Sequence, residues 1–498
     1  MSAAQDQEHH LAALDLGSNS FHLIVVNAAH SRIQIIDKHK EMVRLAAGLG
    51  DNNVLNDETM HRALECLKRF GQRLRSIKPE NLRIIGTNTL RKAANSKQFI
   101  QHAEKALGHK IEIVSGREEA RLIFAGVSHD LGTQDSRRLV VDIGGGSTEL
   151  ILGQNATPEE LESLYMGCVS MSQQYFPNGQ ITGKNMEMAI RAALVELEPV
   201  VAEFINIGWT TCIGASGTIN AIAEVIRLST EEEHITQAGL QQVQEKIIEA
   251  GHADKLDLPG LAAERKPVFA GGVATLSAVF DALSVKSMSA AQTALREGVI
   301  YDLLGRKQHN DARPRTVQSL IKRYRVDEPH AQQVKNTALH LLDEVSKDWT
   351  LNSTDGRDLL SWAALLHEIG MDIAHSGFHK HGAYILAHMD MPGFSRSEQE
   401  QLAFLVRTHR RKLSGVPLER TDATELLRLS ILLRIAVLLH RNRSHESLAK
   451  PKLRAKENQL TLKLPENWLE HHPLTVVDLQ QEAKYLTALD IDLILEPR

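Results

Sequence analysis

The stretch DIGGGSTE at residues 142–149 decides the fold, because it sets three consecutive glycines between two apolar segments, LVV and LIL. Glycine loses more conformational freedom on folding than any other residue, so three in a row are unfavourable in an ordinary hairpin turn. Close approach of the backbone to a ligand explains them better, since successive N–H groups in such a turn form an anion-binding concavity. The stretch therefore predicts a strand, a phosphate-binding turn and a second strand.

An earlier stretch, DLGSNSF at residues 15–21, repeats this order of apolar strand, Asp, Gly and small polar residues. Apolar segments at 11–14 and 21–26 flank it, which is typical of a hairpin. Ser18, Asn19 and Ser20 supply hydrogen-bond donors there without bulk. By itself this turn is better explained as an ordinary hairpin. The repetition predicts two related lobes whose turns clamp a phosphoryl group between them.

Three acidic residues border the two turns. Asp15 ends the first predicted strand, and Asp142 and Glu149 flank the glycine turn. Carboxylate oxygens are the ligands of Mg²⁺, a cation that usually binds together with substrate phosphates. These side chains therefore predict a magnesium site beside the phosphate.

A fourth acidic residue, Glu119, lies in SGREEARLIFAG at residues 115–126. Ser115 followed by Glu118 fits a capping box, so the sequence predicts a helix start there and gives Glu118 a structural role. Glu119 has no such role, and at the junction of the lobes it could hold and deprotonate a water that attacks phosphorus. A solvated glutamate favoured by the helix dipole is the alternative, and the residues alone leave it open.

The rest of the chain predicts further elements and a change of architecture. GASGT at 214–218 follows an apolar strand and opens a helix, which gives a third, weaker anion-binding turn. Pro199 predicts a kink or restart in the helix that begins near residue 186. The cationic stretch 305–325 predicts a linker. Helical periodicity follows over 328–443, and strand-like alternation over 459–464 and 489–495.

Composition and charge bound the class of protein. A chain of 498 residues is too long to fold around a single hydrophobic core, so we expect three or four domains. The net charge, 57 − 62 = −5, requires any polyanion to bind where cations gather locally. An aromatic content of 4% offers no stacking platform and argues against nucleic-acid binding. The N-terminus has no signal-peptide features, and Arg434 interrupts the apolar run 431–439, so the sequence predicts no transmembrane segment. Three scattered cysteines predict a cytoplasmic protein.

Seven motifs occur along the chain in a fixed order: DLGSNSFHL, GTNTLR, SGREEARLIFAG, DIGGGSTEL, MGCVS, GASGT and ALREGVIYDL. With them the chain resembles the exopolyphosphatase and guanosine pentaphosphate phosphohydrolase family from about residue 11 to beyond 440. The resemblance implies an α/β fold with two ribonuclease H-like lobes, as in the actin and sugar kinase superfamily. We expect lobes at 1–125 and 126–306, an all-α domain at 307–445 and a small C-terminal α/β domain at 446–498.

The resemblance also implies roles for individual residues. Glu119 corresponds to the family's catalytic base, Arg91 to a cation beside the site, and Asp142 and Glu149 to its metal-associated acids. The two phosphate loops correspond to Ser18, Asn19, Ser20, Gly144, Gly145, Gly146 and Ser147. The implied activity is Mg²⁺-dependent, processive removal of terminal phosphate from inorganic polyphosphate, in which positioning and charge neutralisation supply most of the rate. The resemblance further implies a homodimer, and the sequence leaves open a peripheral contact with the inner membrane.

The segment ALLHEIG at 363–370, with His340 upstream, resembles the helical domain of HD phosphohydrolases. An intact site of that kind uses two histidines and two aspartates. Glu368 stands in place of one aspartate, and residues 432–440 offer no second one. We therefore expect no working metal site there, with His340 and His367 as buried structural residues.

Cations gather in the same region. His379, Lys380 and His381 lie in AHSGFHKHGAY (374–384), predicted as a loop, and RTHRRK (407–412) follows. They predict a channel for a long polyanion whose affinity falls with salt, and scattered cations on helix ends are the alternative. The sequence favours an exopolyphosphatase, with guanosine pentaphosphate as the alternative substrate of the same site. A non-catalytic polyphosphate or alarmone sensor and an ATP-binding kinase are less well supported.

Overall fold

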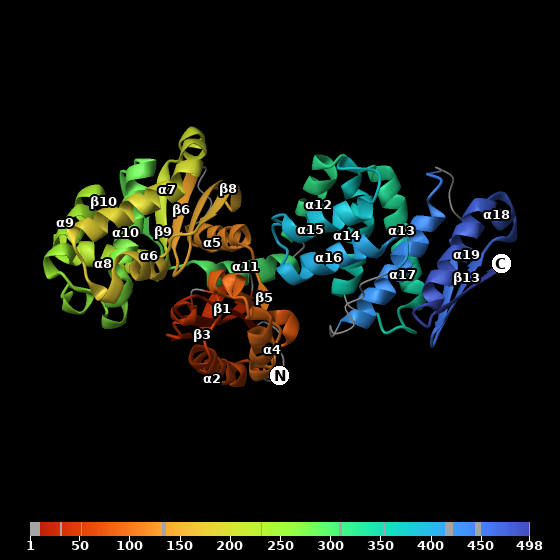
Figure 1. Ribbon diagram of the computed structural model, residues 1–498, viewed down its shortest axis with the longest axis horizontal. Helices are drawn as coiled ribbons and strands as arrows, with labels where there is room; N and C mark the ends of the chain where they lie inside the picture. The colour runs from red at the N-terminus through yellow and green to blue at the C-terminus, as the bar shows by residue number, and fades with distance from the viewer. Residues whose placement is uncertain are drawn as a thin grey trace. The chain divides into compact units, whose positions relative to one another are not determined.

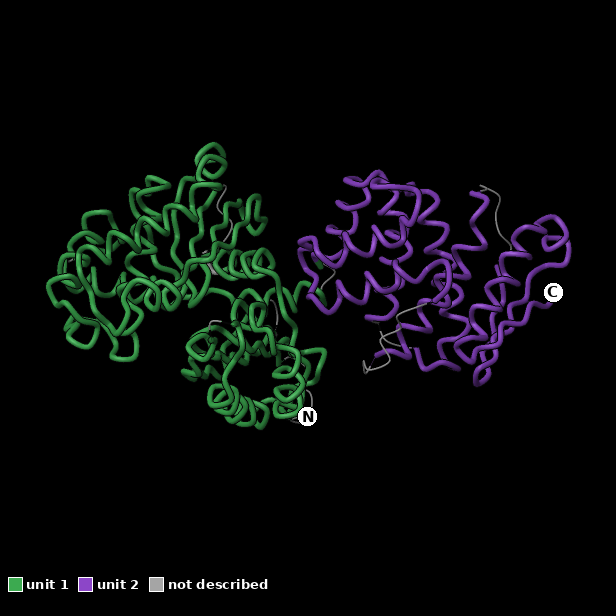
Figure 2. Tube along the Cα trace, in the orientation of Figure 1, with its two compact units in different colours: residues 1–311 green, residues 312–498 purple. Residues whose placement is uncertain are grey.

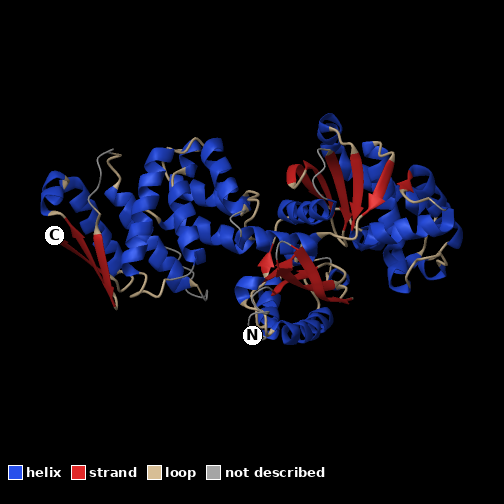
Figure 3. Cartoon of the chain, turned by 180° about the vertical axis from the view of Figure 1, so that it is seen from behind, coloured by secondary structure: helices blue, strands red, loops and turns tan. Residues whose placement is uncertain are grey.

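The computed structural model describes residues 10–29, 32–50, 52–131, 136–230, 232–307, 311–351, 354–413, 422–443 and 450–497. The chain forms two compact units, Met1–Asp311 and Ala312–Arg498 (Figure 2). The first unit combines two β-sheets with helices, and the second is mostly helical with one small sheet (Figure 3). The mixed sheets of the first unit confirm the predicted α/β class. The four predicted domain ranges stay predictions.

The N-terminal lobe is built on a five-stranded sheet in the order β3-β2-β1-β4-β5 (Figure 1). Its strands are β1 (His10–Leu16), β2 (Phe21–Ala29), β3 (Arg32–Glu41), β4 (Leu82–Gly86) and β5 (Glu112–Ile113). Helices α2 (Asp57–Leu74) and α4 (Ser96–Leu107) bury their apolar stripes against one face of this sheet. Helices α5 (Gly116–Leu131) and α11 (Leu295–Lys307) pack on the other face and also against the second sheet, so the two lobes share a core.

The second lobe is built on a six-stranded sheet in the order β10-β11-β9-β6-β7-β8. Its strands are β6 (Arg137–Ile143), β7 (Thr148–Gln154), β8 (Thr157–Leu164), β9 (Thr211–Ala215), β10 (Ile235–Thr236) and β11 (Ser287–Ala290). Its main helices are α6 (Cys168–Tyr175), α7 (Gly183–Ile207), α8 (Ser216–Thr230), α9 (Gln237–Ala250) and α10 (Lys266–Leu283). These helices and the sheet enclose a separate apolar core.

The two lobes repeat one arrangement, as the sequence predicts. In the first, β1 pairs antiparallel with β2 and parallel with β4. In the second, β6 pairs antiparallel with β7 and parallel with β9. Asp15 faces His22 across its hairpin, and Asp142 faces Glu149 at the matching position of the other. Each glycine turn therefore lies at the end of a central strand, where a ligand between the lobes can reach it.

Helix α7 differs from the prediction of a break at Pro199, because it runs unbroken over Gly183–Ile207. Pro199 is exposed, as is Val195 one turn earlier, whose carbonyl loses its helical partner to the proline. Water can satisfy a carbonyl on that face, so the helix continues.

The stretch Ala263–Leu283 is long and apolar enough to cross a membrane by length and composition, although no transmembrane segment is predicted from the sequence. In the structure 72% of its most apolar window is buried. Helix α10, which it contains, is buried almost throughout in the core of the second lobe. It packs as a core helix.

The second unit begins with a helix where the sequence predicts a linker. Within the cationic stretch, α12 (Ala312–Arg323) buries Val317, Leu320 and Ile321 in the core of the unit. Three of its four cations, Arg315, Lys322 and Arg323, are exposed, and the density of charge in the sequence obscured this apolar stripe. Residues 308–310 of the predicted linker lie outside the described residues.

The predicted helical region and the terminal segment form one core. The helices are α13 (Glu328–Val345), α14 (Thr354–Leu366), α15 (Phe378–His388), α16 (Arg396–Thr408) and α17 (Ala423–Leu439). The terminal segment contains β12 (Lys452–Lys456), β13 (Gln459–Leu464), α18 (Glu466–His471), α19 (Pro473–Thr487) and β14 (Asp492–Pro497). Leu453, Leu460 and Leu462 of the terminal segment belong to the same apolar cluster as the helices.

Candidate active site

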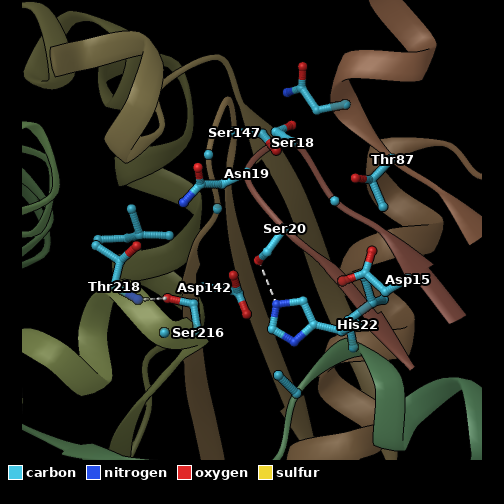
Figure 4. Close-up of a pocket in the computed structure, with 18 of the residues that line it drawn as sticks. Asp15, Ser18, Asn19, Ser20, His22, Thr87, Asp142, Ser147, Ser216 and Thr218 are labelled. Carbon is cyan, nitrogen blue, oxygen red and sulfur yellow. Dashed lines mark hydrogen bonds between the residues drawn. The ribbon is translucent and has the colours of Figure 1, made fainter. Parts of the chain in front are cut away.

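A cavity of about 150 Å³ lies between the two lobes of the first unit and contains both predicted turns. Ser18, Asn19 and Ser20 line it from the first lobe, and Gly144, Gly145 and Ser147 from the second. Figure 4 shows Asp15 and Thr87 on one side of the cavity and Ser216 and Thr218 on the other. The structure thus brings the two turns together around one small space. Gly146 is not among the lining residues and lies against Asn88 instead.

The two turns approach each other so closely that one position tolerates only glycine. A Cβ atom added to Gly145 would lie 2.8 Å from the Cβ of Ser18. Behind the turn, Cys168 and Val169 donate their backbone N–H groups to the carbonyls of Gly144 and Gly145, at 2.9 and 2.8 Å. On the other side, Thr89 donates its hydroxyl to Ser18 Oγ at 2.8 Å. Both turns are therefore held before any ligand arrives, as preorganised anion binding requires.

Three carboxylates line the same cavity: those of Glu119 and Asp142, which are buried, and that of Asp15, which is half-buried. Burial, followed by repulsion from Glu119, raises the pKa of Asp15 to about 8 and that of Asp142 to about 7. The Oδ1 atom of Asp15 is buried and has no hydrogen-bond partner among the described residues. Acidic groups so crowded and desolvated are unfavourable as anions unless a cation joins them.

Glu149 occupies a different place from the one that its sequence position suggests. It does not line the cavity, and it accepts a hydrogen bond from Ser163 Oγ at 2.8 Å behind Asp142. Burial, followed by the charges of Glu119 and Asp142, raises its pKa well above the usual range. The structure therefore places Glu149 in a second layer around the acidic group.

Glu119 points into the cavity from the first turn of α5, and Arg91 fixes its orientation. Arg91 Nη1 donates to Glu119 Oε2 at 2.7 Å and to the carbonyl of Val114 at 3.0 Å. Ser115 caps the helix by accepting from the N–H of Glu118 at 3.1 Å, as predicted. The Glu118 carboxylate binds Arg121 at 2.7 and 2.8 Å, which confirms its structural role. Of the two neighbouring glutamates, only Glu119 lines the cavity.

Two arginines that the sequence analysis did not select, Arg265 and Arg296, also line the cavity. Arg296 lies in ALREGVIYDL, and its Nη1 donates to His22 Nδ1 at 2.9 Å. His22 Nδ1 is thus an acceptor, so Nε2 carries the proton and donates to Ser20 Oγ at 2.6 Å. Burial, followed by Arg296, lowers the pKa of His22 to about 3. The motif pointed to Arg296, whereas no local pattern marks Arg265.

The third turn, GASGT, joins the cavity from the N-terminus of α8. Ser216 has a φ of 84°, and its Oγ accepts from the N–H groups of Thr218 and Ile219 at 3.2 and 3.3 Å. A Cβ on Gly217 would lie 1.9 Å from Arg265 Nη2, so glycine leaves the room that this guanidinium occupies. The GASGT motif, a weak signal in the sequence, therefore forms part of the cavity lining.

The predicted channel residues lie in the second unit, and the predicted loop is a helix. His379, Lys380 and His381 form the first turn of α15. His379 is buried at 8% exposure, Lys380 is exposed and His381 is half-buried. Phe378 and His379 face inward because they continue the apolar stripe of α15. Their burial was not predicted, because the sequence predicts a loop for this segment.

Comparison with known proteins places this geometry in a family. The model of the Ppx/GppA phosphatase family matches residues 23–307, and that of its domain III matches residues 312–483. The chain belongs to the Ppx/GppA phosphatase family. Family membership confirms the resemblance seen in the motifs and indicates a phosphate-anhydride hydrolase.

Two relatives within the family cover almost the whole chain, and both are named guanosine-5'-triphosphate,3'-diphosphate pyrophosphatase. The protein from Aeromonas hydrophila subsp. hydrophila is 42% identical over 476 residues, 95% of this chain and 96% of its own. That from Vibrio cholerae is 41% identical over 489 residues, 97% of this chain and 98% of its own.

Solved structures support the fold over about three fifths of the chain. An exopolyphosphatase from Cytophaga hutchinsonii matches with a TM-score of 0.54 at 23% identity, over 59% of this chain and 97% of that chain. The Aquifex aeolicus family member matches with a TM-score of 0.51 at 19% identity, over 60% and 98%. At such identities the likeness concerns the fold alone.

Proposed function

We propose that this protein hydrolyses the terminal 5′ phosphate of guanosine pentaphosphate and releases guanosine tetraphosphate and orthophosphate. The observation that carries the proposal is the near full-length similarity, above 40%, to relatives named for a guanosine triphosphate diphosphate substrate. This similarity reverses the preference for polyphosphate that the cationic motifs suggested, and it favours guanosine pentaphosphate, the alternative substrate. The activity itself rests on the cavity, which combines anion-binding turns with a buried carboxylate.

In the proposed reaction the terminal phosphate lies between the two glycine turns, whose N–H groups point at its oxygens. Arg265 and Arg296 contact the same phosphate or the one behind it. Glu119, held at Oε2 by Arg91, accepts a proton from a water while the water oxygen forms its bond to phosphorus. The bond from phosphorus to the bridging oxygen breaks, and that oxygen leaves with the guanosine tetraphosphate.

The acidic group fits a divalent cation. The unpartnered, buried Oδ1 of Asp15 and the raised pKa of Asp142 both indicate negative charge that the described residues leave uncompensated. Asp15 and Asp142 would hold Mg²⁺ through oxygen, with Glu149 supporting them from behind. When bound, the cation neutralises charge on the phosphate oxygens.

Mg²⁺ should stabilise the protein more at pH 8.5 than at pH 5.5. Without metal, the raised pKa values of Asp15 (about 8) and Asp142 (about 7) mean that the folded state binds more protons than the unfolded state between about pH 4 and 8. Stability therefore falls as pH rises through that window. Mg²⁺ at about 100 times its Kd adds about 2.7 kcal/mol, and competing protons reduce that gain at low pH.

Melting curves with and without Mg²⁺ at the two pH values measure this difference. Asp142→Asn should remove most of the stabilisation by Mg²⁺ at pH 8.5, and Asp281→Asn, an exposed change elsewhere in the same lobe, should leave it intact. Equal stabilisation at both pH values would contradict a cation held by these carboxylates.

A second cavity supports a nucleotide rather than a bare phosphate chain. It measures about 470 Å³ and shares Ser18 and Asn19 with the phosphate cavity. Val169, Phe176 and Val268 give it apolar walls of the kind that hold a purine base. Arg44, which is exposed, also lines this cavity and could pair with the charge of a 3′ diphosphate.

Phosphate release from guanosine pentaphosphate and from long-chain polyphosphate, each alone and in competition, tests the proposal. We expect a higher kcat/KM for the nucleotide, and we expect Arg44→Ala to raise its KM about tenfold, as loss of a charged hydrogen bond does. Arg75→Ala, an exposed change at the end of α2, is the matched control. Preferential release from polyphosphate would restore the exopolyphosphatase assignment, and release from neither would exclude both.

A further inference from the structure

The second unit contains a cavity of about 480 Å³ that the proposed hydrolysis does not use. Three histidines line it from separate parts of the unit: His330 in the first turn of α13, His367 directly after α14 and His409 directly after α16. Their exposed fractions are 5%, 1% and 2%. Glu368, at 9%, lies beside them. The burial expected for His367 is confirmed, and its surroundings give it a further role.

Hydrogen bonds fix the protonation of two of these rings. The Nδ1 atom of His367 lies 2.7 Å from the carbonyl of Ala364, and that of His409 lies 2.6 Å from the carbonyl of Val406. A carbonyl oxygen only accepts, so each Nδ1 carries the hydrogen and each neutral ring has its lone pair on Nε2. This is the arrangement by which proteins orient histidines that bind metals through Nε2.

These lone pairs lack partners. Neither Nε2 atom has a hydrogen-bond partner among the described residues, nor does Nδ1 of His330. One ligand atom each of His330, His367 and Glu368 lies within 4.8 Å of the other two, and His367 Nε2 is 3.9 Å from Glu368 Oε1. Ligands bound to one cation at about 2.1 Å lie at most about 4.2 Å apart, so side-chain rotation must bring any wider pair together when the ion binds.

We propose that His330, His367 and Glu368 bind a divalent transition-metal cation of the Zn²⁺, Co²⁺ or Mn²⁺ class, separate from the Mg²⁺ proposed for the first unit. Two imidazoles and one carboxylate favour these cations over Mg²⁺ and Ca²⁺, which prefer oxygen ligands alone. His409 packs edge to face on His367, with ring centroids 5.4 Å apart, and supports it from the side.

Four arginines line the cavity, and two of them, Arg441 and Arg443, have acidic partners that offset their charge next to a cation. Arg441 binds Asp478 at 2.6 Å, and Arg443 binds Asp327 at 2.9 Å. Arg443 also binds Glu368 Oε1 at 2.6 Å, in competition with the metal. Since Arg443 is 42% exposed and keeps Asp327, it can release Glu368. Removing Arg443 should therefore strengthen metal binding.

The sequence predicts no metal here, because Glu368 replaces one aspartate and residues 432–440 offer no second one, and it indicates His340 as the upstream histidine. That side chain is committed elsewhere, since its Nε2 lies 2.8 Å from the carbonyl of Pro451. His330, ten residues earlier on α13, lies next to His367 with ring centroids 5.7 Å apart. Because His340 is not part of the proposed site, His340→Asn serves as a control for the variants of that site.

Titration of the metal-free full chain with Co²⁺ tests the proposal, with binding followed by the visible absorption of the bound ion. We expect one equivalent bound in this unit, affinity at least about tenfold weaker in His367→Asn, and no change in His340→Asn. Asp142→Asn, which alters the first unit, should keep this equivalent. Arg443→Met should bind Co²⁺ more tightly, which gives a test that does not depend on a disruptive variant. No bound Co²⁺, or equal affinity in His367→Asn and Arg443→Met, would overturn the proposal.

Discussion

Replacing Glu119 by Gln should lower kcat about 100- to 10,000-fold, the range for loss of a general base. The amide has the shape of the carboxylate and can still accept the hydrogen bond that Arg91 now donates to Oε2 at 2.7 Å. It cannot take a proton from water. Substrate binding should persist or tighten, because one negative charge leaves a cavity that also contains Asp15 and Asp142.

Single-turnover phosphate release measures the chemical step of this variant, and titration with the nucleotide measures its binding. Glu58→Gln makes the same chemical change on an exposed side chain of α2, 91% accessible, and should behave like the native protein. Loss of binding by Glu119→Gln with the fold intact would give Glu119 a role in holding substrate, contrary to the mechanism proposed above.

The parts of this site that the sequence could predict are those that depend on neighbouring residues. Three glycines between two apolar strands specify a turn locally, and its repetition at DLGSNS specifies a second. The structure brings these turns together as expected, with Asp15 and Asp142 at equivalent hairpin positions. The helix cap at Ser115 could also be predicted from neighbouring residues. It gives Glu118 a structural role and leaves Glu119 free to line the cavity.

The parts that escaped prediction depend on contacts between distant residues. Arg296 reaches His22 across 274 positions, and Arg265 enters the cavity only because Gly217 leaves space for it. In the second unit, the cations of 312–323 concealed an apolar stripe that tertiary packing turns into a helix. The same holds for His330, whose closeness to His367 follows from how α13 and α14 pack and from no spacing in the sequence.

Arg434 gives the second large expected effect: Arg434→Met should destabilise the second unit by about 3 to 5 kcal/mol, the cost of breaking a buried ion pair. Arg434 on α17 is 1% exposed, and Glu482 on α19 is 4% exposed. They form two hydrogen bonds of 2.5 and 2.6 Å, and Arg434 also donates to the carbonyls of Thr408 and Arg411. The methionine would leave the Glu482 carboxylate buried without a cation.

Urea unfolding followed by circular dichroism measures this loss in the transition of the second unit. Arg441→Met is the matched control, because Arg441 also pairs with a residue of α19, Asp478. The Arg441 side chain is 60% exposed, so this pair should contribute less than about 1 kcal/mol. Adding Glu482→Leu to Arg434→Met should recover much of the stability by removing the unpaired charge. If Arg434→Met and Arg441→Met were equally mild, this ion pair would not be what holds the terminal segment to the helices. The sequence marked Arg434 as an interruption in an apolar run, and its partner, 48 residues later, explains why a charge is tolerated there.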